Sequence, residues 1–142
     1  MSYAEYLRPA TNGEGADPAR IFTCTKCGAD FMISNSCDGC GESFDSTFIS
    51  KLIKVEEHLH SYVEQLADAI ASASDLEIPS LRDTVCSDPA GVYLFSPNHY
   101  IRIRLTLCRA KFHLQNREPD LARENWQKYL KAAKPLHNRL II

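Results

Sequence analysis

Two closely spaced cysteine pairs place the strongest constraint on how this chain can fold. Cys24 and Cys27 form one C-x2-C pair, and Cys37 and Cys40 form a second pair after nine intervening residues. Two residues between thiolates let both sulfurs of a pair point into one tight turn. Two such pairs that face each other supply the four tetrahedral sulfur ligands of a structural zinc site.

A glycine follows each cysteine pair, as Gly28 and Gly41. Glycine tolerates the left-handed backbone that such a turn needs, and it lets backbone N–H groups approach the sulfurs. Because protein ligands would fill all four positions, no position remains for an activated water, and the predicted zinc is structural. Its binding would supply on the order of 10 kcal/mol of local folding free energy.

Three other uses of four cysteines remain open from the sequence alone. A disulfide framework fits the even count, but nothing in the sequence suggests an oxidising compartment. A redox C-x-x-C motif needs a thioredoxin-like βαβ context, and two such motifs side by side fit poorly. An iron–sulfur cluster also uses four cysteines, although two C-x2-C pairs around a short ribbon more often hold zinc. We therefore predict one structural Zn²⁺ per chain.

The compartment is predicted from two further features of the sequence. The longest apolar runs are only a few residues, so no segment is expected to span a bilayer. Residues 1–20 lack the charged-then-apolar pattern of a signal peptide. We therefore expect an intracellular protein, cytoplasmic or nuclear or both, with reduced thiols and no membrane partner.

We divide the 142 residues into three parts. Residues 1–20, rich in Pro, Gly, Asn and Asp, predict a flexible N-terminal segment. Residues 21–45 form the predicted zinc knuckle, and residues 46–142 form a predicted α-helical domain. The expected fold class is mainly α, with a small zinc ribbon or double knuckle followed by a helical bundle. Four apolar residues are expected to cover the knuckle: Phe22, Phe31, Ile33 and Phe44.

A long helix is predicted directly after the knuckle, over residues 46–72. Asp45 or Ser46 is a suitable N-cap. Charged residues, Glu56 among them, are expected mostly outside its apolar stripe. Other helices of the same chain, and not a second copy in a coiled coil, are expected to cover the stripe. Steps of three and four place these residues on one face: Phe48, Leu52, Val55, Leu59, Tyr62, Leu66 and Ile70.

Two more helices are predicted after a connector that contains a short helix near residues 79–86. Ser96 and Pro97 suit the N-cap and first position of one helix, and Pro119 suits the first position of the other. Pro135 is expected to end the last helix. This antiparallel hairpin is similar to a single tetratricopeptide unit, which cannot bury its own core, so the long helix must close the bundle.

The order of these parts resembles the C-terminal region of SMYD-type proteins, which are lysine methyltransferases with a SET domain and a MYND finger. The segments "IFTCTKCGADF…CDGCG" and "FSPNHYIRIRLTLCRAKFHLQN" carry the resemblance, together with the step from Pro97 to His99 that opens a helix. It covers residues 20–135 roughly. It implies a post-SET cysteine cluster followed by tetratricopeptide-like helices that line a substrate cleft or bind partners.

The chain departs from that family in ways that limit what the resemblance implies. It contains no SET catalytic motif, no cofactor-binding glycine segment and no MYND finger. In much of the family the post-SET metal site borrows a cysteine from the SET core, whereas four local cysteines suffice here. No catalytic residue can be carried over. Only the four cysteines can, as zinc ligands, and the chain would be a fragment or a shortened relative.

The charge of the chain is unevenly distributed. Residues 99–142 carry ten Lys/Arg and three Asp/Glu, whereas residues 1–98 carry six and fifteen. The basic helix can therefore bind a protein partner or, as an alternative function, nucleic acid. It can equally pair with the acidic residues 56–88 of the same chain. The candidate partner-binding residues are Arg102, Arg104, Arg109 and Lys111.

The remaining reactive side chains are interpreted as structural. The five histidines are scattered and predict no second metal site, and no Ser/His/Asp arrangement or phosphate-binding loop is legible. Cys108 falls on an apolar stripe and is expected in the core. Trp126 and Tyr129 are also expected in the core, with an exposed partner anchor as the less favoured reading. The sequence thus predicts a zinc-binding interaction module and contains no recognisable catalytic motif.

Overall fold

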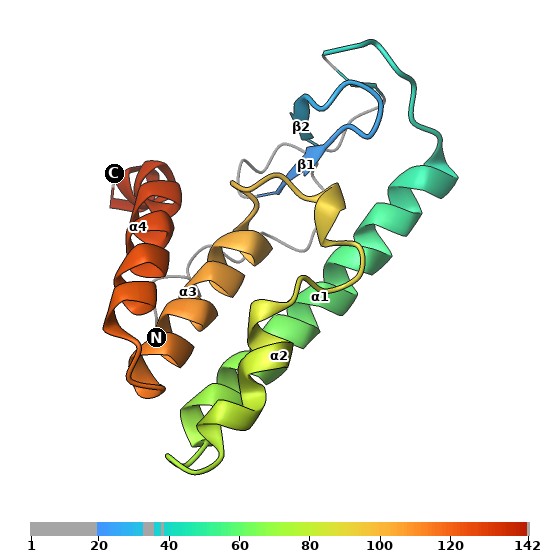
Figure 1. Cartoon of the computed structure of the whole chain (residues 1–142). Helices are drawn as coiled ribbons and strands as arrows, with labels where there is room; N and C mark the ends of the chain where they lie inside the picture. Colours follow the sequence, from blue (N-terminus) through green and yellow to red (C-terminus); the bar gives the residue numbers. More distant parts are fainter. Residues whose placement is uncertain (1–19, 33–35, 38, 142) are drawn as a thin grey trace.

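The computed structural model describes residues 20–32, 36, 37 and 39–141, with side chains described as far as residue 134. The predicted flexible segment therefore lies outside the described residues except for Arg20, which is buried. Ile33 of the predicted apolar cover also lies outside them. The chain is mostly helical, with a small two-stranded sheet near its N-terminus, as the sequence predicts (Figure 1).

The sheet and helices follow one another in a simple order along the chain. Strands β1 (Ile21–Thr23) and β2 (Asp30–Met32) pair antiparallel, with Phe22 opposite Phe31. The long helix α1 (Ser46–Ser72) follows. The connector then contains η2 (Ile78–Leu81), α2 (Arg82–Cys86) and η3 (Val92–Leu94), and the chain ends with α3 (Tyr100–Gln115) and α4 (Pro119–Ile141).

Helix α1 has the predicted bounds, but its buried face differs from the predicted stripe. Asp45 is the N-cap, and its Oδ1 accepts a hydrogen bond of 2.8 Å from the Phe48 backbone N–H. Val55 and Tyr62 are only half-buried, and Glu56 is buried against the expectation that it would lie outside the stripe. A buried carboxylate is tolerated at this position because Arg20 and His99 both form hydrogen bonds with it. The buried residues of α1 are Leu52, Glu56, Leu59, Val63, Leu66 and Ile70.

Helix α3 lies between α1 and α4, so it is covered from two sides (Figure 1). Its apolar residues therefore face neighbours over most of the helix surface, as its composition predicts. The predicted start of this helix is wrong: it begins at Tyr100, and His99 is its N-cap. Ser96 instead closes a local turn, in which its Oγ accepts a hydrogen bond from the Asn98 N–H.

Helices α3 and α4 form a hairpin, with Pro119 at the first position of α4. The likeness of this hairpin to a tetratricopeptide unit stays a prediction. The turn between them places Arg117 at φ 58°, the left-handed region that ends many helices. Pro135 does not end α4, which continues to Ile141. Proline removes one intrahelical hydrogen bond, and here that loss does not stop the helix. Within the described part of the chain, none of the helices combines the length and apolar character needed to cross a bilayer.

Candidate metal centre

The first cysteine pair lies on a tight loop between β1 and β2. The Cys24 N–H donates to the Ala29 carbonyl at 2.8 Å, and the Gly28 N–H donates back to the Cys24 carbonyl at 2.9 Å. Gly28 has φ +76°, a backbone conformation that costs other residues roughly 1–2 kcal/mol. The loop therefore needs glycine directly after Cys27, as the sequence pattern predicts.

The second cysteine pair repeats the same backbone pattern. The Cys37 N–H donates to the Glu42 carbonyl at 2.8 Å, and the Gly41 N–H donates to the Cys37 carbonyl at 2.9 Å. Gly41 has φ +75°. An isolated bridge between Ser36 and Ser43 closes the base of this loop. Two loops with matching hydrogen bonds and matching glycines are the backbone of a double knuckle.

The two loops bring all four cysteine sulfurs together. The Cys24 and Cys40 sulfurs are 3.8 Å apart, and the Cys27 and Cys37 sulfurs are 3.6 Å apart. All four Sγ atoms lie within 4.8 Å of one another. A tetrahedral site with Zn–S bonds of about 2.3 Å has S–S edges of about 3.8 Å. The cluster can therefore hold one metal ion with little rearrangement.

The surroundings of the thiols shift the pKa values of Cys24 and Cys27 in opposite directions. The backbone N–H of Cys27, followed by that of Lys26, lowers the pKa of Cys24 to about 7. The backbone N–H of Ala29 acts to lower the pKa of Cys27, but burial and the neighbouring thiols raise it to about 12. Four thiolates in one small volume repel one another, and a bound divalent cation is the natural compensation because coordinating thiols are deprotonated.

Gly39 is a site residue that the sequence analysis missed. A Cβ at this position would lie 2.6 Å from the Ala29 Cβ and 3.1 Å from the Cys27 sulfur. Its N–H also donates to the Cys37 sulfur at 3.3 Å. Gly39 thus lets the second loop close onto the first. The signal in the sequence was its place inside the second C-x2-C pair, where a small residue permits this approach.

The double knuckle packs against the helical body through aromatic side chains. Phe22 is fully buried and lies 5.4 Å from the Phe95 ring and 5.2 Å from the His99 ring, measured between centroids. Phe31 contacts Phe44 at 4.6 Å. The predicted apolar cover is therefore present at three of its four residues. The apolar contacts of the knuckle also extend to Phe95 and His99, which lie just before α3.

Polar contacts reinforce the same junction. The Ser96 N–H donates to the Ile21 carbonyl at 2.9 Å, and the Ser96 hydroxyl donates to Asp30 Oδ2 at 3.0 Å. A further bridge pairs Phe22 with Phe95. The segment before α3 therefore binds β1 much as a third strand would. Its contacts fix the knuckle to the entry of the C-terminal hairpin.

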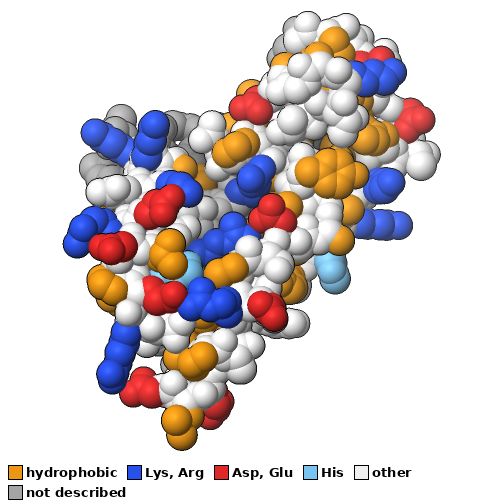
Figure 2. Space-filling model, viewed as in Figure 1, with side chains coloured by type: hydrophobic (Ala, Val, Ile, Leu, Met, Phe, Trp, Pro, Cys, Tyr) orange, Lys and Arg blue, Asp and Glu red, His pale blue; other side chains and the backbone are white. Residues whose placement is uncertain are grey.

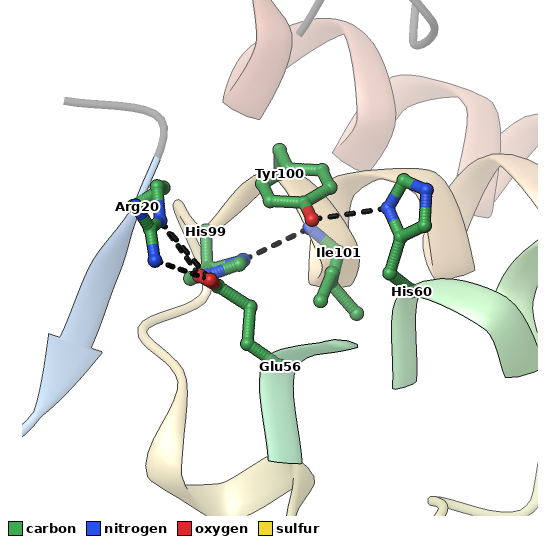
Figure 3. Close-up of polar contacts among 6 residues, drawn as sticks. All are labelled: Arg20, Glu56, His60, His99, Tyr100 and Ile101. Atoms are coloured by element: carbon green, nitrogen blue, oxygen red, sulfur yellow. Dashed lines mark hydrogen bonds and ion pairs between the residues drawn. The ribbon is translucent and has the colours of Figure 1, made fainter. Parts of the chain in front are cut away.

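A buried charged network joins the residue before β1, helix α1 and the N-cap of α3 (Figure 3). Arg20, which directly precedes β1, donates to both carboxylate oxygens of Glu56 on α1 at 2.6–3.1 Å. His99 Nε2 lies 2.7 Å from Glu56 Oε2. Burial alone would raise the pKa of the Glu56 carboxyl, but the hydrogen bonds and charges of His99 and Arg20 lower it overall.

The hydrogen bonds fix the tautomer of His99. Its Nδ1 accepts from the Ile101 backbone N–H at 3.0 Å, so the proton of the neutral ring must lie on Nε2, from which it is donated to Glu56. Beside this network, the Tyr100 hydroxyl lies 3.0 Å from His60 Nδ1. Both histidines were expected to be surface or structural residues, and the partnership of His99 with Glu56 was not predicted.

The four predicted partner-binding residues of α3 are used differently from one another. Arg102 donates to the Phe95 carbonyl at 3.1 Å, and Arg109 binds the Val85 and Ser87 carbonyls and Asp88. Arg104 is buried, with its guanidinium 3.9 Å from the Glu64 carboxylate. Lys111 is exposed.

Two of the four side chains, Arg104 and Arg109, pair with acidic residues of the same chain, whereas Arg102 binds a backbone carbonyl. On the face shown in Figure 2, basic and acidic side chains are interspersed and no broad patch of one sign appears. A nucleic-acid footprint would be expected to gather cations on one face. Partner binding through the basic side of α3 as a whole stays a prediction, and Lys111 is its best-placed residue.

Comparison with known proteins gives no relative for this chain. No family model matches it, and no curated protein and no solved structure matches it.

Proposed function

We propose that this protein is a zinc-binding module that presents a helical surface to a protein partner. The observation that carries the proposal is the set of four sulfurs within 4.8 Å of one another, from Cys24, Cys27, Cys37 and Cys40. Zinc is favoured over other metals because four thiolates in tetrahedral arrangement suit it, and because all positions would be filled by protein. Its role is then structural, and reduced thiols of this kind suit an intracellular compartment.

The zinc would hold the knuckle in the shape that docks onto the helices. Phe22 lies on β1 directly before the first cysteine loop and contacts the His99 ring, so a knuckle that loses its metal would also lose the support for this contact. Most members of the hydrophobic core lie on α1, on α3 and in the connector between them, whereas Cys24 and Cys37 lie at its knuckle end. We therefore expect the metal to order residues 20–45 and to leave most of the helix content in place.

The resemblance to the C-terminal region of SMYD-type methyltransferases extends this proposal. In that reading the module is an accessory part, and its tetratricopeptide-like helices bind a partner or line a cleft formed with a catalytic domain. It has no methyl-transfer activity of its own. Isothermal titration of the zinc-loaded chain with the methyl donor of such enzymes should give no binding heat. Saturable binding would refute the accessory reading.

The metal site is tested by matched cysteine variants. We expect Cys24→Ser and Cys40→Ser each to weaken the thiolate-to-metal charge-transfer absorption of the Co²⁺-substituted protein, because one of the four Co–S bonds is lost. Cys86→Ser is the control, because Cys86 is exposed and lies outside the cluster. If the cluster variants keep the full absorption of the wild-type Co²⁺ protein, or if Cys86→Ser weakens it, the assigned ligand set is wrong.

A further inference from the structure

A shallow apolar groove runs between α3 and α4, on a side that no other helix of the described residues covers. Ala110 and Leu114 of α3 and Ala122 and Trp126 of α4 line it, and its volume is about 260 Å³. Leu114 is 68% exposed and Trp126 is 45% exposed. The prediction that Trp126 lies in the core with Tyr129 is therefore wrong for Trp126, while Tyr129 is buried.

Two cations lie beside this apolar floor. Lys111 and Arg123 line the groove and are exposed, and none of the described lining residues is acidic. Arg123 lies 4.0 Å from Asp120, with both side chains largely exposed. Such a surface pair contributes little, so the guanidinium remains able to bind another anion.

The shape and chemistry of the groove limit what can occupy it. Small-molecule sites usually enclose 300–1,000 Å³, so this open hollow suits a side chain of a partner better than a free ligand. Two antiparallel helices offer ridges and grooves into which a third helix packs. Interfaces of this kind concentrate binding energy in Trp and Arg, and both are present here.

We propose that the α3–α4 groove binds an acidic amphipathic helix of a partner protein. Its apolar face would lie against Leu114 and Trp126, and its flanking carboxylates would meet Lys111 and Arg123. A second copy of this chain is a poorer occupant. A two-fold interface that placed the groove against itself would bring these cations toward their own copies. The inference rests on the proposed function and names the partner class for its helical surface.

The test uses the full zinc-loaded chain and a synthetic helical peptide without Trp. The peptide carries Leu at positions i, i+3, i+4 and i+7 and Glu on both flanks of that stripe. Trp126 is the one tryptophan of the 142 residues, so its emission reports on the groove directly. We expect a saturable blue shift at micromolar peptide, and no shift from a peptide whose Leu residues are replaced by Ser.

Charge reversal provides the matched comparison. The double variant Lys111→Glu/Arg123→Glu should bind the Glu peptide at least tenfold more weakly and should bind a Lys-flanked version of it more tightly. The control Lys51→Glu/Lys54→Glu reverses two exposed charges on α1 and should change affinity by less than twofold. Circular dichroism of both variants must match that of the wild type.

Several results would overturn this proposal. They are the absence of a shift at millimolar peptide, equal weakening by the control variant, and a concentration-dependent shift of the chain alone that accompanies dimerisation in sedimentation. An oligonucleotide that gives the same shift and displaces the peptide would assign the groove to nucleic acid instead. Zinc content measured on the same samples separates the two proposals, because failed peptide binding by a chain with one zinc leaves the metal site intact.

Discussion

The buried network of Arg20, Glu56 and His99 allows a quantitative prediction. Glu56 receives hydrogen bonds from both partners in a site where its own side chain is only 6% exposed. Truncating it in Glu56→Ala would remove the Glu56 carboxylate from the buried Arg20 guanidinium and from the His99 N–H. Removing one partner of a buried ion pair costs about 3–5 kcal/mol. Small domains are stable by only about 5–15 kcal/mol in total, so this loss would be severe.

The free energy of unfolding is best measured by urea denaturation with excess zinc present, monitored by far-ultraviolet circular dichroism. We expect Glu56→Ala to lower it by about 3–5 kcal/mol with an unchanged denaturant slope. Glu57→Ala is the matched control, because Glu57 is the exposed neighbour on the same helix. Its effect should stay within about 0.5 kcal/mol.

A double-mutant cycle separates the ion pair from general damage to the core. Arg20→Met alone would leave Glu56 with His99 only, whereas Arg20→Met/Glu56→Leu removes both charges together. Replacing a buried pair by apolar residues is often nearly neutral, so we expect the double variant to be about 2–3 kcal/mol more stable than additivity requires. A loss below about 1 kcal/mol for Glu56→Ala, or additive effects in the cycle, would refute this account of the network.

Three further predictions address the helical body. Asp45→Ala removes the N-cap of α1 and should cost about 0.5–2 kcal/mol in the same denaturation assay, whereas an unchanged midpoint would show that the cap is dispensable. Gly91→Ala should lower the free energy of unfolding by about 1–2 kcal/mol or more, because Gly91 has φ +88° and an added Cβ would lie 2.9 Å from Val55. The control is Ala90→Gly, at the exposed neighbouring residue. Equal effects of the two substitutions would contradict the strain argument. Hydrogen bonds from Arg82, followed by those from His113 and Asn116, lower the pKa of Glu118 to about 2. A lowered pKa stabilises the fold fully above the unfolded-state value near 4.5, and this contribution disappears as the pH falls toward 2. Glu118→Gln should therefore destabilise the protein more at pH 6 than at pH 3, and a constant difference would refute the assignment.

Much of the site could be predicted because its chemistry is local in the sequence. The spacing of the four cysteines and the glycines that follow them determine a backbone pattern within a few residues. The bounds of α1 were equally accessible, since its cap and its apolar period are both short-range signals. The close approach of Gly39 to Ala29 was not accessible, because it depends on how the two loops face each other.

The errors arose where distant residues meet. Glu56 has the sequence character of a solvated helix residue, and only the proximity of Arg20 and His99 makes its burial favourable. Trp126 follows the helical period of a core residue, but nothing in the described structure covers that side of α3 and α4. The start of α3 was misplaced because Ser96 makes a local turn, and the His99 imidazole takes the capping role.

The central claim is that four thiolates hold one zinc ion whose role is structural. Native mass spectrometry of protein purified without added metal or chelator tests it most directly. The account predicts one zinc per chain. It also predicts that chelation removes protection from proteolysis in residues 20–45 while most of the helical circular dichroism signal remains. A chain without metal, or one whose mass shows these cysteines oxidised to disulfides, would contradict the account.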